Sequence, residues 1–260
     1  MEIILFILVV FNVVAIGLLF IKKIAQKLHL QTFAKKAAFC SLILFVSLFT
    51  MSFTNAPVRK EKITERETKR NFSNSYTTTQ IDSLRGIYAK NKELPLGYEL
   101  QTLLALTYYP EFINMPIKFI KKDIKTTMAC QPDIHYILKT GKRAYIIFID
   151  TDKKGEGIEL SEVPFNAQIG VIGHELAHII DYESKNTLEL VSTGVGYLFG
   201  SYKHHLEHTV DGITIKRGLG WQLRDWADFA MNQSAASDQY KTFKKEIYMH
   251  PEEIEKQLKK

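Results

Sequence analysis

The chain has 260 residues, of which 46% are hydrophobic and 24% are charged, a balance that fits one folded domain together with a strongly apolar segment. The formal net charge of +6 raises the possibility of a nucleic-acid partner, but lysines and acidic residues are interspersed through the folded part without an aromatic and basic surface pattern, which argues against nucleic-acid binding. Two cysteines, Cys40 and Cys130, are too few for a disulfide framework and fall in different parts of the chain.

The apolar residues concentrate in two runs near the N-terminus. Residues 3–21 carry no charged side chain and match the roughly 20 residues that cross a bilayer, and residues 37–53 form a shorter second run. The chain opens with Met1-Glu2 and shows no clear Ala-x-Ala after the first run, so this run predicts an anchor rather than a cleaved signal peptide. We expect residues 1–54 to form a two-helix transmembrane hairpin, with the lipid membrane as a partner.

The charges beside these runs predict sidedness. Short basic loops remain in the cytoplasm, and the loop between the runs contains lysines but no acidic residue: Lys22, Lys23, Lys27, Lys35 and Lys36. Arg59, Lys60 and Lys62 argue for the opposite orientation, although acidic residues are mixed among them. The expected localisation is a membrane protein with two spans and an extracytoplasmic domain.

A polar stalk is expected over residues 55–80, before a folded domain over residues 81–260. Apolar spacing predicts helices at 81–92 and 97–109, broken by Leu94-Pro95. Strands are predicted at 117–120, at 135–138 paired as a hairpin with 144–149, and at 157–160. The last of these is either an edge strand that holds an extended peptide or an ordinary hairpin strand.

The strongest motif is His174-Glu175-Leu176-Ala177-His178. On a helix, the i, i+4 spacing places both imidazoles on one face, where they suit Zn²⁺, and Glu175 is placed to take a proton from a metal-bound water. The surrounding residues from Ile169 to Ile180 are aliphatic or Gly, so the helix, expected from Pro164 to about Tyr182, is buried. Gly170 and Gly173 indicate close packing against a neighbouring backbone. The alternative is two core histidines hydrogen-bonded to the backbone.

A catalytic zinc site needs a third protein ligand, which must lie further along the chain. Glu207 and Asp211 are four residues apart on a segment, 187–217, that reads as helical with a break around Gly194, Gly196 and Gly200. One of the two carboxylates can bind the metal while the other holds a ligand imidazole by its free N–H.

With this pair, the sequence resembles the gluzincin metallopeptidases, whose signature is His-Glu-x-x-His followed on a later helix by Glu-x-x-x-Asp. The two-span start is similar to that of the HtpX-like and CAAX-processing membrane peptidases. The resemblance covers about residues 145–220. It implies zinc bound by His174, His178 and Glu207, with Glu175 as general base and Asp211 holding a ligand histidine.

Other donors compete for these roles. His204, His205 and His208 are rival ligands or members of an exposed polar face, and Asp181 is either an acceptor for a ligand histidine or a solvated residue at the helix end. The residue that stabilises the oxyanion is left open among five candidates: His204, His208, Arg217, Tyr240 and Tyr248.

The predicted fold class is α+β, with the transmembrane hairpin followed by a mainly helical, zincin-like domain that contains a small β-sheet. The expected function is zinc-dependent hydrolysis of a peptide or protein substrate. Two alternatives are a membrane-anchored zinc-binding scaffold without turnover and a structural domain without metal. Cys130 is expected to be a buried small side chain rather than a nucleophile.

Overall fold

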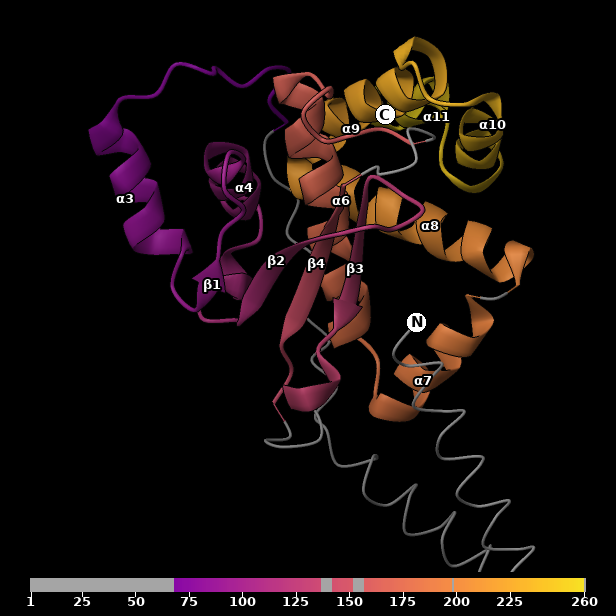
Figure 1. Ribbon diagram of the computed structural model, residues 1–260, viewed down its shortest axis with the longest axis horizontal. Coiled ribbons are helices and arrows are strands. Elements are labelled where there is room, and N and C mark those ends of the chain that lie inside the picture. The colour runs from indigo at the N-terminus through magenta and orange to yellow at the C-terminus, as the bar shows by residue number, and fades with distance from the viewer. Residues whose placement is uncertain (1–67, 137–141, 152–156, 198, 260) are drawn as a thin grey trace, which may run out of the picture. The chain divides into compact units, whose positions relative to one another are not determined.

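The computed structural model describes residues 68–136, 142–151, 157–197 and 199–259. The predicted transmembrane hairpin at 1–54 lies outside these ranges. Every helix within them is too short or too polar to span a bilayer. The described residues divide into two compact units. Those of 185–199 belong to the first, and those of 68–184 and 200–259 belong to the second, which is a mixed α+β structure (Figure 1).

The second unit contains a four-stranded sheet in the order β1-β2-β4-β3. β1, β2 and β4 are parallel, while β3 is antiparallel to β4. β4 is the most deeply buried strand, as expected for a strand with neighbours on both sides, and it confirms the apolar run predicted at 144–149. The strands are β1 (Lys92–Glu93), β2 (Ile117–Lys122), β3 (Met128–Pro132) and β4 (Tyr145–Asp150).

Two predicted strands are wrong. The antiparallel partner of β4 is β3. Of the strand predicted at 135–138, residues 135 and 136 lie in a helical turn, which starts where the Asp133 carboxylate accepts a hydrogen bond from the His135 N–H (2.9 Å), and residues 137 and 138 lie outside the described ranges. Residues 157–160 form bends and turns, and their two apolar side chains, Ile158 and Leu160, are buried without strand pairing. The edge strand beside the long helix is therefore β3.

The first helices lie close to their predicted positions. α3 (Thr78–Tyr88) begins three residues early because Thr77 caps it: the Thr77 hydroxyl accepts from the Gln80 N–H (3.3 Å), and the Gln80 side chain accepts from the Thr77 N–H (2.9 Å). α4 (Glu99–Leu106) is buried along most of its length and is followed by the 3₁₀ turn Pro110–Phe112.

Residues 68–77, the last part of the predicted stalk, lie against the domain. The Arg70 guanidinium pairs with the Asp225 carboxylate at 2.9 Å, and the Gln222 side chain donates to the Lys69 carbonyl at 2.8 Å. The packed part of the chain thus begins before residue 81.

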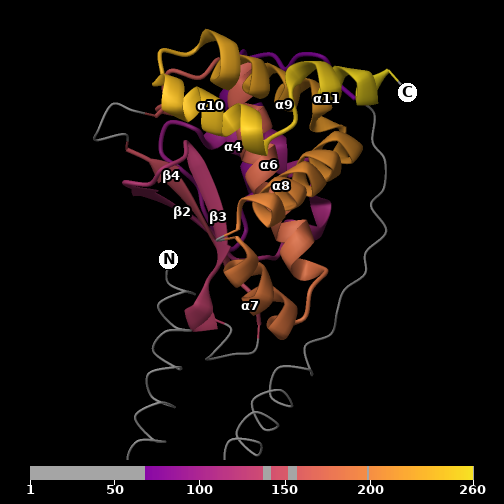
Figure 2. The ribbon, with the colours of Figure 1, turned by 90° about the vertical axis from the view of Figure 1, so that its right-hand side faces the viewer.

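The centre of the second unit is α6 (Phe165–Glu183), which packs against β3, α4, α8 (Gly200–Thr214) and α9 (Gly220–Asp228) (Figures 1 and 2). It begins after Pro164 and ends one residue beyond the predicted Tyr182. An ideal Cβ at Gly170 would lie 2.1 Å from the Gln222 carbonyl oxygen, so glycine permits the close approach of the α6 and α9 backbones that was predicted. At Gly173 the close neighbour is the Leu219 side chain rather than a backbone.

The C-terminal half is a series of helices that folds back over α6. Between α8 and α9, the π-helical segment η2 (Ile215–Leu219) contains Gly218 at a φ of 94°, a left-handed conformation that favours glycine and bends the chain. The remaining elements in this unit are η3 (Phe229–Gln233), α10 (Asp238–Ile247) and α11 (Pro251–Leu258), and the last confirms the helix start predicted at Pro251.

In the first unit, α7 (Thr187–Gly196) is the described helix. Asn186 and Glu189 exchange hydrogen bonds between side chain and backbone N–H at its start, at 2.7 and 3.0 Å. α7 ends at Gly196 and α8 begins at Gly200, which confirms the helix break predicted at the glycines.

Candidate metal centre

Three buried side chains from two helices converge at one point. His174 and His178 lie one turn apart on α6, and Glu207 faces them from α8, with one ligand atom from each residue within 4.8 Å of the others. The Glu207 Oε2 atom lies 3.1 Å from His174 Nε2 and 3.4 Å from His178 Nε2. The structure therefore brings together the three residues predicted to bind metal, and this group can bind a metal ion.

Asp211 lies behind the cluster, one turn along α8 from Glu207. Its Oδ1 atom is 2.8 Å from His174 Nδ1, so it occupies the place predicted for a carboxylate that holds a ligand imidazole. The other oxygen of Asp211 accepts a hydrogen bond from the Met249 backbone N–H at 3.0 Å. Asp211 thus connects α6 to the segment that follows α10.

The electrostatics of the cluster favour a positive charge between the carboxylates. Burial alone would lower the pKa of His174, but hydrogen bonds and charge interactions with Asp211 and Glu207 outweigh it and raise this pKa to about 10. Burial alone would raise the pKa of Glu207, yet the charge of His178 and the hydrogen bonds from both histidines hold it well below its usual range. A divalent cation would replace the His174 proton as the positive charge in this place.

Two groups of the cluster have incomplete hydrogen bonding among the described residues: Glu175, through Oε2, and His178, through Nδ1. Glu175 is the one that is not a predicted metal ligand. It is 4% exposed, and among the described residues its Oε2 atom has no hydrogen-bond partner. Burial raises the pKa of Glu175, although the charges of His178 and His174 act against this. A buried carboxylate oxygen without a protein partner fits a water held beside a metal ion, and two imidazoles with one carboxylate are a known ligand set of catalytic zinc.

The rival donors lie elsewhere. His204 and His205 are exposed, and the His204 ring packs on the His208 ring at 4.0 Å between centroids. Asp181 is buried, but in the described part of the chain the converging ligand atoms belong to His174, His178 and Glu207 alone.

Tyr248 is the candidate for stabilising the oxyanion that contacts a predicted metal ligand: the centroids of the Tyr248 and His174 rings are 5.6 Å apart. The Tyr240 hydroxyl is bonded to Thr127 Oγ1 at 2.8 Å. Arg217 is buried in an ion pair with Glu111. These contacts favour Tyr248 for the role.

The contacts of Tyr182 beside the site escaped the sequence analysis. The Tyr182 ring stacks on His178 (5.9 Å), and its hydroxyl donates to the Cys130 carbonyl on β3 at 3.2 Å, which ties the edge strand to α6. Cys130 is half-buried rather than buried as expected, and desolvation together with the charge of Glu175 raises the pKa of its thiol, which disfavours a nucleophilic role. The i, i+4 spacing of His178 and Tyr182 could have predicted that their rings stack.

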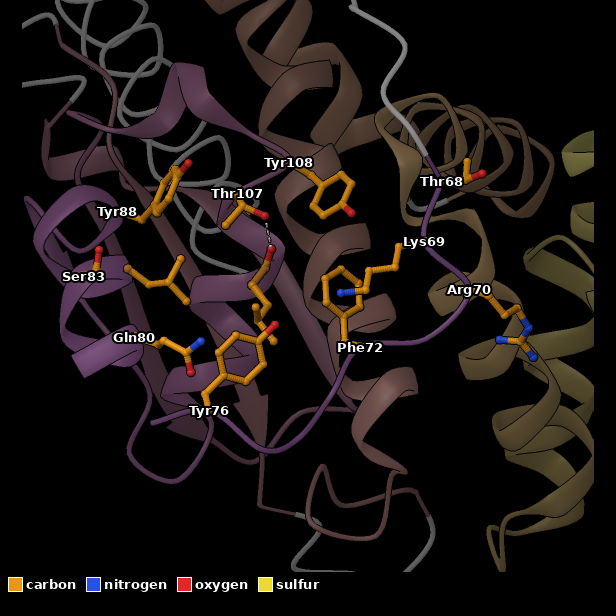
Figure 3. Close-up of a pocket in the computed structure, with 12 residues that line it drawn as sticks. Thr68, Lys69, Arg70, Phe72, Tyr76, Gln80, Ser83, Tyr88, Thr107 and Tyr108 are labelled. Atoms are coloured by element: carbon orange, nitrogen blue, oxygen red, sulfur yellow. Dashed lines mark hydrogen bonds between the residues drawn. The ribbon is translucent and has the colours of Figure 1, made fainter. Parts of the chain in front are cut away.

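A separate groove of about 1040 Å³ opens between residues 68–76 and the helices α3 and α4 (Figure 3). Aromatic rings line it, and the end of the Arg70 side chain points away from them (Figure 3). The Arg70 guanidinium pairs with Asp225 instead. The metal-centre residues are not among those that line the groove, so its aromatic wall belongs to a different face. Its aromatic lining residues are Phe72, Tyr76, Tyr88 and Tyr108.

Comparisons with family models, curated proteins and solved structures gave no match for this chain.

Proposed function

We propose that this chain is a membrane-anchored, zinc-dependent metallopeptidase of the gluzincin type. The observation that carries the proposal is the convergence of His174, His178 and Glu207 beside Glu175, whose buried Oε2 atom has no hydrogen-bond partner among the described residues. A structural zinc site closes its fourth position with another Cys or His and has no need of such a carboxylate, whereas a hydrolytic site requires one.

Each residue has a defined task in this proposal. His174, His178 and Glu207 would hold the zinc ion, which when bound would supply Lewis acidity towards a peptide carbonyl and a water molecule. Glu175 accepts the proton of that water and transfers it to the leaving amine. Asp211 fixes the orientation of His174 through Nδ1.

Tyr248 is the residue that we assign to the developing oxyanion. Its ring lies against His174, and its position after α10 is secured on both sides: the Tyr248 N–H donates to the Lys244 carbonyl at 3.1 Å, and the next residue donates to Asp211. A phenol in this place can donate a hydrogen bond to an oxyanion formed beside the metal ligands.

We assign the edge role, first expected at residues 157–160, to β3. Backbone hydrogen bonds join β3 to β4 at alternate residues, as the bonds from Asp133 N–H to the Ala144 carbonyl and from Asp150 N–H to the Thr127 carbonyl show. The residues between them, Met128 and Cys130, therefore direct their carbonyls away from β4. The Met128 carbonyl accepts a hydrogen bond from the Thr126 hydroxyl, and the Cys130 carbonyl accepts one from the Tyr182 hydroxyl. A substrate strand that pairs with β3 would displace the two hydroxyls.

The test compares the wild-type full-length chain with Glu175→Gln and with the exposed control Glu246→Gln. We expect bound zinc in all three, cleavage of an unfolded test protein by the wild type and the control, and a steep loss of cleavage in Glu175→Gln. Zinc without cleavage in the wild type would indicate the scaffold alternative, and absence of zinc would indicate the structural alternative. A topology reporter fused at the C-terminus tests the proposed extracytoplasmic orientation of the domain.

A further inference from the structure

The face of α8 that carries Glu207 also carries a lysine one turn earlier. Lys203 and Glu207 are four residues apart, so their side chains leave the helix on the same side. Lys203 is half-buried, and its Nζ atom lies 4.4 Å from the centre of the Phe243 ring. The lysine stem therefore lies along an aromatic side chain while its charge stays beside the metal centre.

A continuous aromatic wall connects this lysine to the proposed zinc ligands. Phe243 contacts the edge of the Tyr248 ring at 6.3 Å, and Tyr248 lies 5.6 Å from His174. The buried Lys244 ammonium lies 4.2 Å from the centre of the Tyr248 ring. One side of the centre is thus built from α10 and the first half of α8, and it contains two cations.

A third cation comes from the connection between β2 and β3. Burial lowers the pKa of Lys203, Glu207 raises it, and the charges of Lys244 and Lys125 lower it further. The charges of Lys125 and Lys244 thus oppose that of Glu207 in their effect on Lys203. Once Glu207 binds a divalent cation, its negative charge is shared with that ion, and the lysines keep a net positive potential on this side.

We propose that the site prefers peptides that present a carboxylate close to the scissile bond, with Lys203 as the residue that contacts it. The carboxylate is either an Asp or Glu side chain or the free C-terminus of the peptide, since both offer the same anionic oxygens. Lys125 and Lys244 strengthen the field on this side of the centre. This inference rests on the proposed peptidase function and adds its substrate class.

The test uses fluorogenic peptides that differ in one feature: Glu against Gln at a position beside the scissile bond, and a free C-terminal carboxylate against a C-terminal amide. We expect the wild-type full-length chain to prefer one anionic member by about tenfold in kcat/KM, mainly through KM, because a half-buried charge pair supplies about that factor. The pair that shows the preference identifies the source of the carboxylate. Raising the salt concentration should reduce the preference.

Lys203→Met should abolish the preference, Lys203→Arg should retain most of it, and the exposed Lys245→Met on α10 should leave it intact. Binding of the same peptides to the zinc-loaded Glu175→Gln chain, measured by fluorescence anisotropy, gives a readout that needs no turnover. Equal affinity for anionic and neutral peptides in this assay overturns the substrate inference. Absence of turnover in the wild type, with the anion preference still present in binding, overturns the peptidase proposal instead.

Discussion

Replacing Gly170 with alanine perturbs the closest contact between the helix that carries the metal ligands and its neighbour. The new Cβ would lie 2.1 Å from the Gln222 carbonyl oxygen and 2.8 Å from the Leu223 nitrogen. Both atoms belong to the α9 backbone, so no side-chain rotation relieves the overlap. We expect α6 and α9 to separate by on the order of 1 Å, and a displacement of that size at catalytic groups can reduce activity about a hundredfold.

The magnitude follows from two opposing terms. Alanine in place of glycine stabilises a helix by about 1 kcal/mol, while overpacking a core typically costs about 1–3 kcal/mol and more where only backbone can move. Gly170→Ala should therefore lower the free energy of unfolding by about 2 kcal/mol or more. Gly86 on α3 is the matched control, since its Cβ would meet no atom within 4 Å and alanine there should be neutral or stabilising. Gly173→Ala should fall between them, because it meets the flexible end of Leu219.

Urea unfolding followed by tryptophan fluorescence measures this series directly. The two tryptophans of the chain, Trp221 and Trp226, both lie on α9, the helix that contacts Gly170. Zinc binding by the same variants should weaken in the order of their destabilisation, because His174 lies one turn from Gly170. A Gly170→Ala chain as stable as Gly86→Ala would refute the close helix contact.

Three further predictions concern the metal centre and its support. The pKa of His174 is about 10, and zinc binds only the neutral imidazole, so zinc affinity should rise by at least about tenfold per pH unit from pH 7 to pH 9. Competition with a chelator at each pH measures this affinity, and an affinity that does not change with pH would contradict the prediction. Asp211→Asn should weaken zinc binding by about 10- to 100-fold while the fold, followed by circular dichroism, persists; unaltered affinity would exclude its supporting role. Arg217→Met removes the ion pair between Arg217 and Glu111 and should lower the free energy of unfolding, measured in urea, by about 3–5 kcal/mol. The double variant Arg217→Met/Glu111→Leu should regain part of that free energy. Equal stability of the single and double variants would contradict that account.

The parts of the fold that could be predicted are those with strong local signals. The periodicity of residues 164–182, the apolar run of β4 and the proline at 251 lie where the structure has α6, β4 and the start of α11. The strand pairing was predicted wrongly because β3 has no clear alternation of apolar and polar side chains, and its pairing with β4 is a tertiary choice. Likewise, the apolar residues at 157–160 signalled burial, which the core provides without a strand.

The sequence by itself determined that His174, Glu175 and His178 share a helix, because the helical repeat sets their spacing, and it singled out Glu207 and Asp211 by the same repeat. Only the tertiary structure decided that Glu207 faces the two imidazoles and Asp211 the far side of His174, since this depends on how α8 crosses α6. It also decided that Tyr248 lies beside His174 and that Lys203 on α8 lies against Phe243 on α10. α10 begins 55 residues after α6 ends (183 to 238), so these contacts arise from packing rather than from local pattern.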